Sequence, residues 1–508
     1  MAAYLELLMF AIIITSSCGT DGWFKVAVFE HARQGDSTPE SAQSVISTNL
    51  DFYKRAATVA KAKATELIVY PEYGIFAPQP TRAEIREFLE SIPDPEVNRT
   101  NPCNEPERYQ SRPILYTLSC IAEQNRLIVV ANMGEITHCD NNPECPDDGA
   151  FHLNTNVVFD KDGTLIFRYH KEHLFFELAL DLPKENHNPV FTTELGTFAT
   201  FIAFDLVFKK AAEVARRPDV DAVLCSTYWI NSFSLHTSIQ FWESWAIGNK
   251  ATFLAANVQA PGYLAVGSGI FKGKNGSLAY TLYPDGISKL LVAEISRKSA
   301  SNVHRRPLES SVTLITKDGS YDWQGDGKDL PKECDDIKQG KKKDNSKEFQ
   351  CFKESLEKYS LIKLSQPKGH AQACNNQMCC SVNYVTSGLK SNFYLAVFNG
   401  THNSFDRYFW VEENCFLARC DILDGERCDF QTKSKTRFHS LHLTANFTTS
   451  YVYPSVMSSG SRLVPVHKWN ITEYLNTQSI NFYSLQGLEL LVASFKGRCY
   501  DRDPPYVR

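Results

Sequence analysis

Three positions in the first half of the sequence lie at the ends of strand-like runs. Glu72 comes after ELIVY, Lys171 comes after LIFRYH, and Ala203 comes after TFI. Open α/β sheets present their sites at strand ends, so we expect these positions to lie together. A carboxylate that accepts a proton, beside an ammonium that stabilises a developing oxyanion, is suited to amide cleavage. The third position holds alanine, which has no reactive group.

The elements that must position these residues alternate between strand and helix patterns from Trp23 to about Arg297. Strands are predicted over 24–32, 66–76, 126–136, 199–208, 221–229 and 251–259. Helices are predicted from Pro39 to about residue 64, with Thr38 as N-cap, and over 112–125, 207–217 and 238–250. Hairpins are predicted over 154–170, around a Lys-Asp-Gly turn, and over 277–295. This order indicates a layered α/β domain whose helices cover a largely buried sheet.

The second half of the chain has a different pattern. The stretch 317–350 is charged and nearly free of aliphatic residues, which is typical of a solvated loop or linker. After Cys351 the runs are β-like, and nine of the 15 cysteines fall between Cys334 and Cys499. The spacing of Cys374, Cys379 and Cys380, like that of His439 and His442, is also compatible with metal ligands, but disulfides are the preferred interpretation of the cysteines.

The composition excludes some partners. The chain has 508 residues, 43% of them hydrophobic, and a formal net charge of -5. A globular protein of several domains is therefore expected, with no basic surface for nucleic acid.

Several features predict export. Residues 1–20 contain an apolar run followed by small residues, which is typical of a signal peptide, although a short buried helix is the alternative. The polar C-terminus offers no hydrophobic tail for a GPI anchor, and no transmembrane segment is expected. Five N-x-S/T sequons predict glycosylation at Asn98, Asn275, Asn399, Asn446 and Asn470. We expect a secreted, extracellular protein with disulfides.

Four segments carry a resemblance to a known family. VYPEYGIF, NTNVVFDKDGTLIFRYHKEHLF, FIAFDLVF and GSGIF resemble the nitrilase superfamily of carbon–nitrogen hydrolases, and more narrowly its vanin (pantetheinase) and biotinidase branch. The resemblance covers most of 24–300 and extends more loosely to the C-terminal region. It implies a four-layer α-β-β-α sandwich with a second, β-rich, disulfide-stapled domain. The expected division is a signal peptide at 1–20, a nitrilase-like domain at 21–305, a charged linker or loop at 306–350 and a vanin-type domain at 351–508.

The resemblance also assigns expected roles. The family uses a glutamate base, a lysine and a cysteine that forms a thioester, without a cofactor or metal. Glu72 matches the base, Lys171 matches the lysine, and Glu177 would match a further carboxylate, although its spacing differs. Ala203 stands where the family has its cysteine, in the motif Phe-x-Cys-Phe-Asp.

Two neighbouring positions depart from the family pattern as well. Tyr73 replaces an aspartate, and Lys209-Lys210 replace a His-Asp pair. These departures favour a natural divergence over an engineered replacement of the nucleophile.

Three functions stay open from the sequence. The first is a catalytically impaired homologue that binds a pantetheine- or biocytin-like amide. The second is an active amidohydrolase that uses water or Cys225, with Ser226 and Thr227 as weaker candidates. The third is a secreted interaction protein that acts through its C-terminal domain and the 317–350 loop. Cys225 is more often a structural thiol in such a position, and Cys120 is then the expected second unpaired cysteine.

Overall fold

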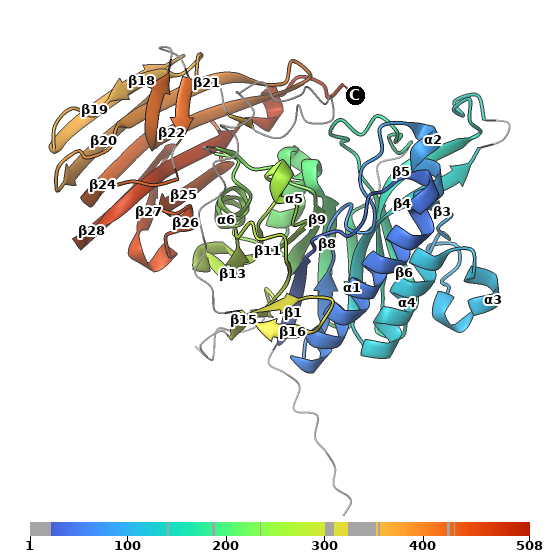
Figure 1. Cartoon of the computed structure of the whole chain (residues 1–508). Helices are drawn as coiled ribbons and strands as arrows, with labels where there is room; N and C mark the ends of the chain where they lie inside the picture. Colours follow the sequence, from blue (N-terminus) through green and yellow to red (C-terminus); the bar gives the residue numbers. More distant parts are fainter. Residues whose placement is uncertain are drawn as a thin grey trace, which may run out of the picture.

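The computed structural model describes residues 22–139, 142–184, 188–233, 235–299, 309–323, 352–353, 356–423, 427–430 and 432–507. The expected signal peptide and most of the expected linker lie outside these residues. In Figure 1 the α/β domain and the C-terminal β domain lie side by side.

Two sheets form the centre of the first domain. In the first sheet the strand order is β16-β15-β14-β1-β2-β4-β5-β6, with β3 beside β4, and in the second it is β13-β12-β11-β9-β8-β7. The first comprises β1 (Trp23–Glu30), β2 (Leu67–Val69), β3 (Leu89–Glu90), β4 (Ile128–His138), β5 (Ala150–Phe159), β6 (Leu165–His170), β14 (Ser288–Ser296), β15 (Ser310–Ile315) and β16 (Ser320–Asp322). The second comprises β7 (Val190–Thr193), β8 (Gly196–Ile202), β9 (Ala222–Thr227), β11 (Thr252–Asn257), β12 (Ser268–Lys272) and β13 (Ser277–Thr281).

Helices cover the outer faces of both sheets. Helices α1 (Ala42–Ala62) and α4 (Pro113–Asn125) pack their apolar faces on the first sheet, and α5 (Lys209–Arg216) and α6 (Ser238–Asn249) pack on the second. Alternate strand residues such as Val28, Leu224 and Leu254 fill the core between the sheets. Two shorter helices are α2 (Arg82–Ile85) and α3 (Pro106–Tyr109). The expected α-β-β-α sandwich is confirmed.

The C-terminal domain is built of strands, as expected. Its order is β18-β21-β22-β28-β24-β20-β19, with β23, β25, β26 and β27 paired at its margins. The strands are β18 (Ser360–Lys363), β19 (Lys368–Asn375), β20 (Met378–Thr386), β21 (Phe393–Ser404), β22 (Tyr408–Leu423), β23 (Arg427–Phe430), β24 (Arg437–Asn446), β25 (Val452–Ser458), β26 (Arg462–Leu463), β27 (Asn470–Tyr474) and β28 (Thr477–Arg498). Disulfides Cys374–Cys379 and Cys380–Cys415 cross-link it. A small parallel pair, β10 (Ser232–Phe233) with β17 (Phe352–Lys353), joins the two halves of the chain.

Helix α6 lies between the second sheet and the C-terminal domain (Figure 1). A Cβ atom at Gly248 would lie 2.3 Å from the carbonyl oxygen of Val452 on β25, so only glycine permits this approach. Gln240 on α6 also donates to the hydroxyl of Ser455 at 3.0 Å. The two domains therefore share a closely packed border.

A buried charge cluster lies at the same border. Glu412 on β22 and Lys496 on β28 form an ion pair, and the Lys496 ammonium also contacts Nε2 of His236 from the first domain. The imidazoles of His236 and His402 lie 3.9 and 3.8 Å from the Glu412 carboxylate. Asn414 donates to it at 2.7 Å. We name these residues the border cluster.

Three sequence-based expectations were wrong. The segment 277–295 is not a hairpin, because β13 pairs with β12 in the second sheet while β14 pairs with β1 and β15 in the first. Residues 310–322, expected in the linker, form β15 and β16 at the edge of the first sheet. Cys120 is not a free thiol, because it is bonded to Cys103; within the described ranges, the free cysteines are Cys225 and Cys499.

Other local expectations agree with the structure. The Lys-Asp-Gly turn joins β5 and β6 in an antiparallel hairpin. Four of the sequon asparagines, Asn98, Asn275, Asn446 and Asn470, are exposed, and Asn399 is half-buried. Glycosylation itself stays a prediction. None of the helices in the described residues is long and apolar enough to cross a membrane.

Candidate active site

The structure brings Glu72, Lys171 and Glu177 into one buried cluster. The Lys171 ammonium, directly after β6, lies 2.7 Å from Oε1 of Glu72 and 2.5 Å from Oε2 of Glu177. Only 1% of Glu72 and 3% of Lys171 are exposed, so these ion pairs form away from bulk water. The weakly expected Glu177 is therefore a direct partner of the lysine.

Asn154, on β5, connects the two carboxylates and was not predicted from the sequence. Its Nδ2 donates to Oε1 of Glu72 at 2.8 Å and to Oε1 of Glu177 at 2.7 Å. The backbone carbonyl oxygen of Asn154 accepts from the backbone N–H of Lys171 at 2.9 Å. Its polar character within the strand NTNVVF was the signal that could have indicated it, since buried strand positions favour apolar residues.

The proton affinities in this cluster follow from burial and from sharing a single cation. Burial raises the pKa of Glu72 to about 7, and the adjacent Lys171 opposes that rise without overcoming it. Burial also acts to lower the pKa of Lys171, but Glu177 and Glu72 together outweigh it, so its pKa is raised. Near neutral pH the cluster therefore holds a charged lysine beside a carboxyl group that can both give and accept a proton.

Tyr73, which the resemblance predicts at a position where the branch has an aspartate, lies next to this cluster. Its hydroxyl donates to Oε1 of Glu177 at 2.8 Å, and burial raises its pKa well above the usual value. Its backbone φ is 51°, in the left-handed region that tyrosine rarely adopts. Phe176 (φ 55°) and Ala203 (φ 37°) share this rare conformation beside the site. Such strain persists only where surrounding contacts hold the backbone, and it is common at functional sites.

Ala203 begins the turn that follows β8. Asp205 closes this turn by accepting from the backbone N–H of Ile202 at 3.2 Å. The same carboxylate accepts from the hydroxyl of Tyr169 at 3.1 Å and from the backbone N–H of His173 at 2.9 Å. Tyr169 and His173 lie two residues before and after Lys171. Asp205 therefore connects the turn that contains Ala203 to the segment that contains Lys171.

Cys225 lies beside Ala203 on the neighbouring strand β9. It is fully buried, and burial raises its pKa well above the usual value, even though the backbone N–H of Ala203 favours its thiolate. Its thiol donates to the carbonyl oxygen of Ser226. The hydroxyls of Ser226 and Thr227 are buried and have no hydrogen-bond partner in the described structure. None of these three groups is activated in the way that a nucleophile requires.

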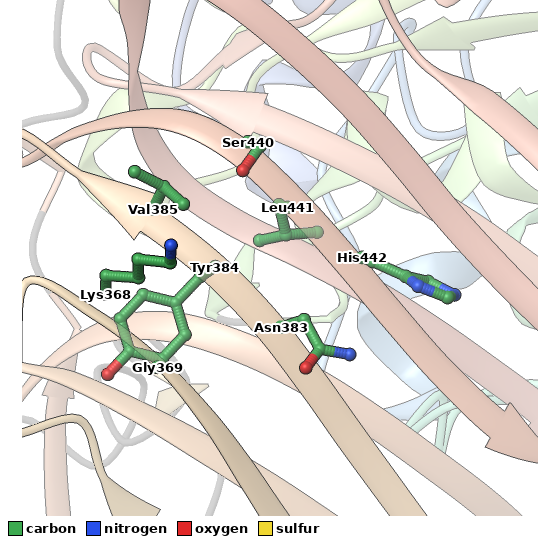
Figure 2. A pocket seen from close by; sticks show the side chains of 8 residues that line it. All are labelled: Lys368, Gly369, Asn383, Tyr384, Val385, Ser440, Leu441 and His442. Atoms are coloured by element: carbon green, nitrogen blue, oxygen red, sulfur yellow. The ribbon is translucent and has the colours of Figure 1, made fainter.

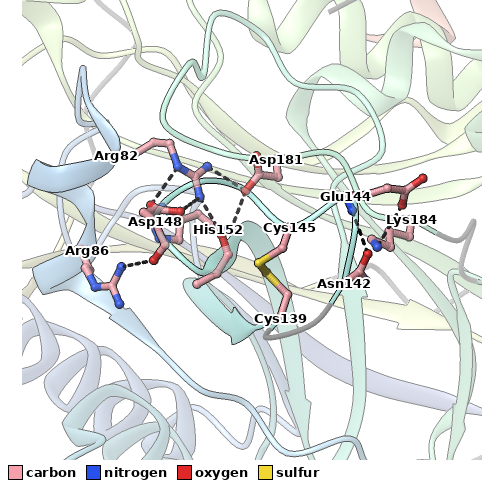
Figure 3. The surroundings of a disulfide bond; sticks show 11 residues. Arg82, Arg86, Cys139, Asn142, Glu144, Cys145, Asp148, His152, Asp181 and Lys184 are labelled. Atoms are coloured by element: carbon pink, nitrogen blue, oxygen red, sulfur yellow. Dashed lines mark hydrogen bonds and ion pairs between the residues drawn. A yellow bond between two sulfur atoms is a disulfide. The ribbon is translucent and has the colours of Figure 1, made fainter.

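The segment after Glu177 is held by an ion-pair network shown in Figure 3. Arg82 lies 2.8 Å from both Asp148 and Asp181, and Asp181 accepts from the backbone N–H of His152 at 2.8 Å. The disulfide Cys139–Cys145 closes the loop before Asp148. This network ties the Glu177 segment to β5, the strand that carries Asn154.

Lys209 and Lys210, the second departure predicted from the resemblance, form ion pairs with residues outside this cluster. Lys210 pairs with Glu172 at 2.5 Å, and Lys209 pairs with Asp501 of the C-terminal domain at 2.7 Å. The Lys210–Glu172 pair is partly buried, and the exposed Lys209–Asp501 pair joins the domains.

The C-terminal sheet has a separate pocket of about 360 Å³ (Figure 2). It is lined by Lys368, Gly369, Asn383, Tyr384, Val385, Ser440, Leu441 and His442. Nε2 of His442 forms a hydrogen bond with the hydroxyl of Thr444 at 2.7 Å. Nδ1 of His439 forms one with the backbone carbonyl oxygen of Ser484 at 3.1 Å. In the part of the chain that the structure describes, no group of three His, Cys, Asp or Glu side chains is arranged to hold a metal ion.

Comparison with known proteins agrees with this arrangement. Residues 31–305 match the carbon-nitrogen hydrolase family, and 349–503 match the vanin C-terminal domain. The chain is 31% identical to a pantetheinase of Bos taurus, over 98% of this chain and 93% of that protein. It is 30% identical to a pantetheinase of Homo sapiens (99% and 93%) and 31% identical to a biotinidase of Bos taurus (94% and 93%). The chain therefore belongs to the vanin and biotinidase branch of the carbon–nitrogen hydrolase (nitrilase) superfamily.

Proposed function

We propose that this protein is a secreted member of its branch that binds a small amide, pantetheine- or biocytin-like, and has lost covalent hydrolysis of it. One observation carries the proposal. Glu72, Lys171 and Glu177 form a buried carboxylate–lysine cluster, while Ala203, in the turn after β8, has only a methyl side chain. A methyl group cannot form a thioester, so the expected base has no side-chain nucleophile to deprotonate and no covalent oxyanion intermediate forms for the lysine to stabilise.

The buried Cys225 does not supply a replacement. Its raised pKa keeps it as a thiol at neutral pH, and its thiol is fully buried on β9. Water is the alternative nucleophile, because Glu72, with a pKa of about 7, is partly ionised near neutrality and can accept a proton from it. Hydrolysis by this route is expected to be many powers of ten slower than by a thiolate.

The test is hydrolysis of a chromogenic pantothenate amide by the secreted protein and by its Ala203→Cys variant. We expect no turnover by the parent and clear turnover by the variant. The matched control is the double variant Ala203→Cys/Lys171→Met, which should be inactive because the lysine is absent. Turnover by the parent that disappears in Cys225→Ser would overturn the proposal in favour of an active amidohydrolase.

A further inference from the structure

Arg33 is a cation next to the carboxylate–lysine cluster. It lies in the loop after β1 and is half-buried. Its Nη1 donates to the carbonyl oxygen of Tyr73 at 2.9 Å, and Tyr73 directly follows Glu72 in the chain. The backbone N–H of Tyr228 donates to Oε2 of Glu72 at 2.9 Å. Arg33 and Glu72 are thus connected through the same short stretch of backbone.

The backbone on both sides of Arg33 is fixed. His31 bonds Asn49 at 2.8 Å and Ser288 at 3.0 Å through its two ring nitrogens. The N–H of Gln34 donates to Oδ1 of Asn49 at 2.8 Å. Because both neighbouring segments are held, the guanidinium is positioned before any ligand arrives, and little conformational entropy is lost on binding.

The charge of Arg33 is not neutralised by the protein. Among the described residues no carboxylate acts on the pKa of Arg33: besides burial, the hydroxyls of Tyr228, Tyr263 and Tyr53 do, and the charge of Arg33 in turn lowers the pKa of His31. Lys171, in contrast, already bonds two carboxylates. Arg33 is therefore a cation near the cluster, among the residues described, that can pair with an anion from solution.

The surroundings of Arg33 allow a ligand to enter from solvent. Tyr228 is partly exposed and Tyr263 is 37% exposed, so water reaches this side of the site. The rings of Tyr228 and of Tyr73, whose carbonyl oxygen Arg33 bonds, meet edge to face at 6.3 Å on this side of the site. Burial lowers the pKa of Arg33, but a guanidinium remains charged at neutral pH.

We propose that Arg33 is a specificity-determining residue that binds an oxyanion, a carboxylate or phosphate, carried by the amide ligand. A guanidinium offers two parallel N–H donors to such a group, which a lysine cannot do. This inference rests on the proposed binding of a small amide. It adds that an anionic amide is preferred to a neutral one of the same shape.

The test compares matched ligands by titration calorimetry on the full-length secreted protein. One pair is pantetheine and its 4′-phosphate, and the other is biotin methylamide and biotinylglycine. We expect the anionic member of at least one pair to bind about tenfold or more tightly, as one charged hydrogen-bonded contact contributes. The pair that responds distinguishes phosphate from carboxylate.

The variants assign the effect to the guanidinium. Arg33→Met should abolish the difference within the pair, and the loss of its bond to the Tyr73 carbonyl oxygen should affect the neutral and the anionic ligand alike. Arg33→Lys should keep part of the difference. The control is Arg437→Met, because Arg437 is an exposed partner of Glu489 on the C-terminal sheet, where we expect no change.

The outcomes separate the two proposals. If neutral and anionic ligands bind the parent equally, the role of Arg33 is wrong while amide binding stands. If the difference persists in Arg33→Met, another group binds the anion and the inference is again wrong. If none of the four ligands binds, both the inference and the proposed function are overturned.

Discussion

Glu72 in the active-site cluster and Glu412 in the border cluster are both buried, yet their proton affinities move in opposite directions. Burial raises the pKa of Glu72 to about 7. Burial also acts to raise the pKa of Glu412. Lys496, His402 and His236 outweigh this effect and hold the pKa of Glu412 well below the usual value.

The difference lies in the ratio of cations to carboxylates. In the active-site cluster one ammonium, Lys171, serves two carboxylates. In the border cluster one carboxylate faces an ammonium and two imidazoles. Burial penalises a charge in both places, and the local count of opposite charges decides whether the ionised form survives. A carboxyl group kept near neutrality suits proton transfer, whereas a fully ionised one suits a fixed structural contact.

The largest expected effect is from Lys496→Met in the border cluster. It leaves Glu412 buried without its ammonium, so the free energy of unfolding should fall by about 3–5 kcal/mol. Urea unfolding followed by tryptophan fluorescence at pH 7 measures the loss. The double variant Glu412→Gln/Lys496→Met removes both charges and should recover much of it. A single variant within about 1 kcal/mol of the parent would show that the border pair is not a strong buried ion pair.

Lys171→Met should destabilise the protein less, by about 2–3 kcal/mol at pH 7.5, since Glu72 can take up a proton when the ammonium is lost. For the same reason the loss should shrink at pH 5.5. The control is Lys54→Met, whose exposed pair with Asp51 is expected to contribute less than about 1 kcal/mol. A loss that is equal at both pH values would contradict the proposed sharing of one cation.

Glu72→Gln should remove a pH dependence. Because the pKa of Glu72 is raised in the folded protein, its contribution is fully present below about 4.5 and is lost as the pH rises to about 7. The stability of the parent relative to the variant should fall across that window with a slope of up to about 1.4 kcal/mol per pH unit. Thermal unfolding midpoints between pH 4.5 and 8 measure it. A constant difference would mean that Glu72 is ionised throughout, like Glu412.

The smallest expected effect is that of Tyr73→Phe. It removes one hydroxyl donor to Glu177, while Asn154 and Lys171 continue to satisfy the carboxylate. We expect a loss of about 1 kcal/mol in the free energy of unfolding. Tyr321→Phe is the control, because that hydroxyl belongs to a side chain that is 56% exposed. No loss in Tyr73→Phe would show that the tyrosine does not stabilise the cluster.

Much of the fold could be predicted from local pattern. The helices α1, α4, α5 and α6 and the β5–β6 hairpin lie close to their expected positions because periodicity, proline at the helix start and the Lys-Asp-Gly turn act over a few residues. The segment 277–295 shows where this fails. Its two strands and turn have the pattern of a hairpin, but each half belongs to a different sheet, which local sequence does not specify.

The candidate site divides in the same way. Strand-end positions and the family resemblance indicated Glu72, Lys171 and Ala203, and the structure adds that Glu177 meets the lysine. Asn154 and Arg33 were missed because their importance comes from partners that lie 23 to 82 residues away in the chain. The unpaired thiol was assigned to Cys120 for a similar reason, since pairing depends on which sulfurs come within bonding distance.

By itself, the sequence determined the family, the order of strands and helices, and the presence of alanine at position 203, because residue identity and short-range periodicity carry this information. Only the tertiary structure decided that one lysine serves two carboxylates, that Cys225 is buried beside Ala203, and that Arg33 keeps its charge unpaired. These properties depend on distance and on the exclusion of water, and both arise only when segments remote in the chain pack together.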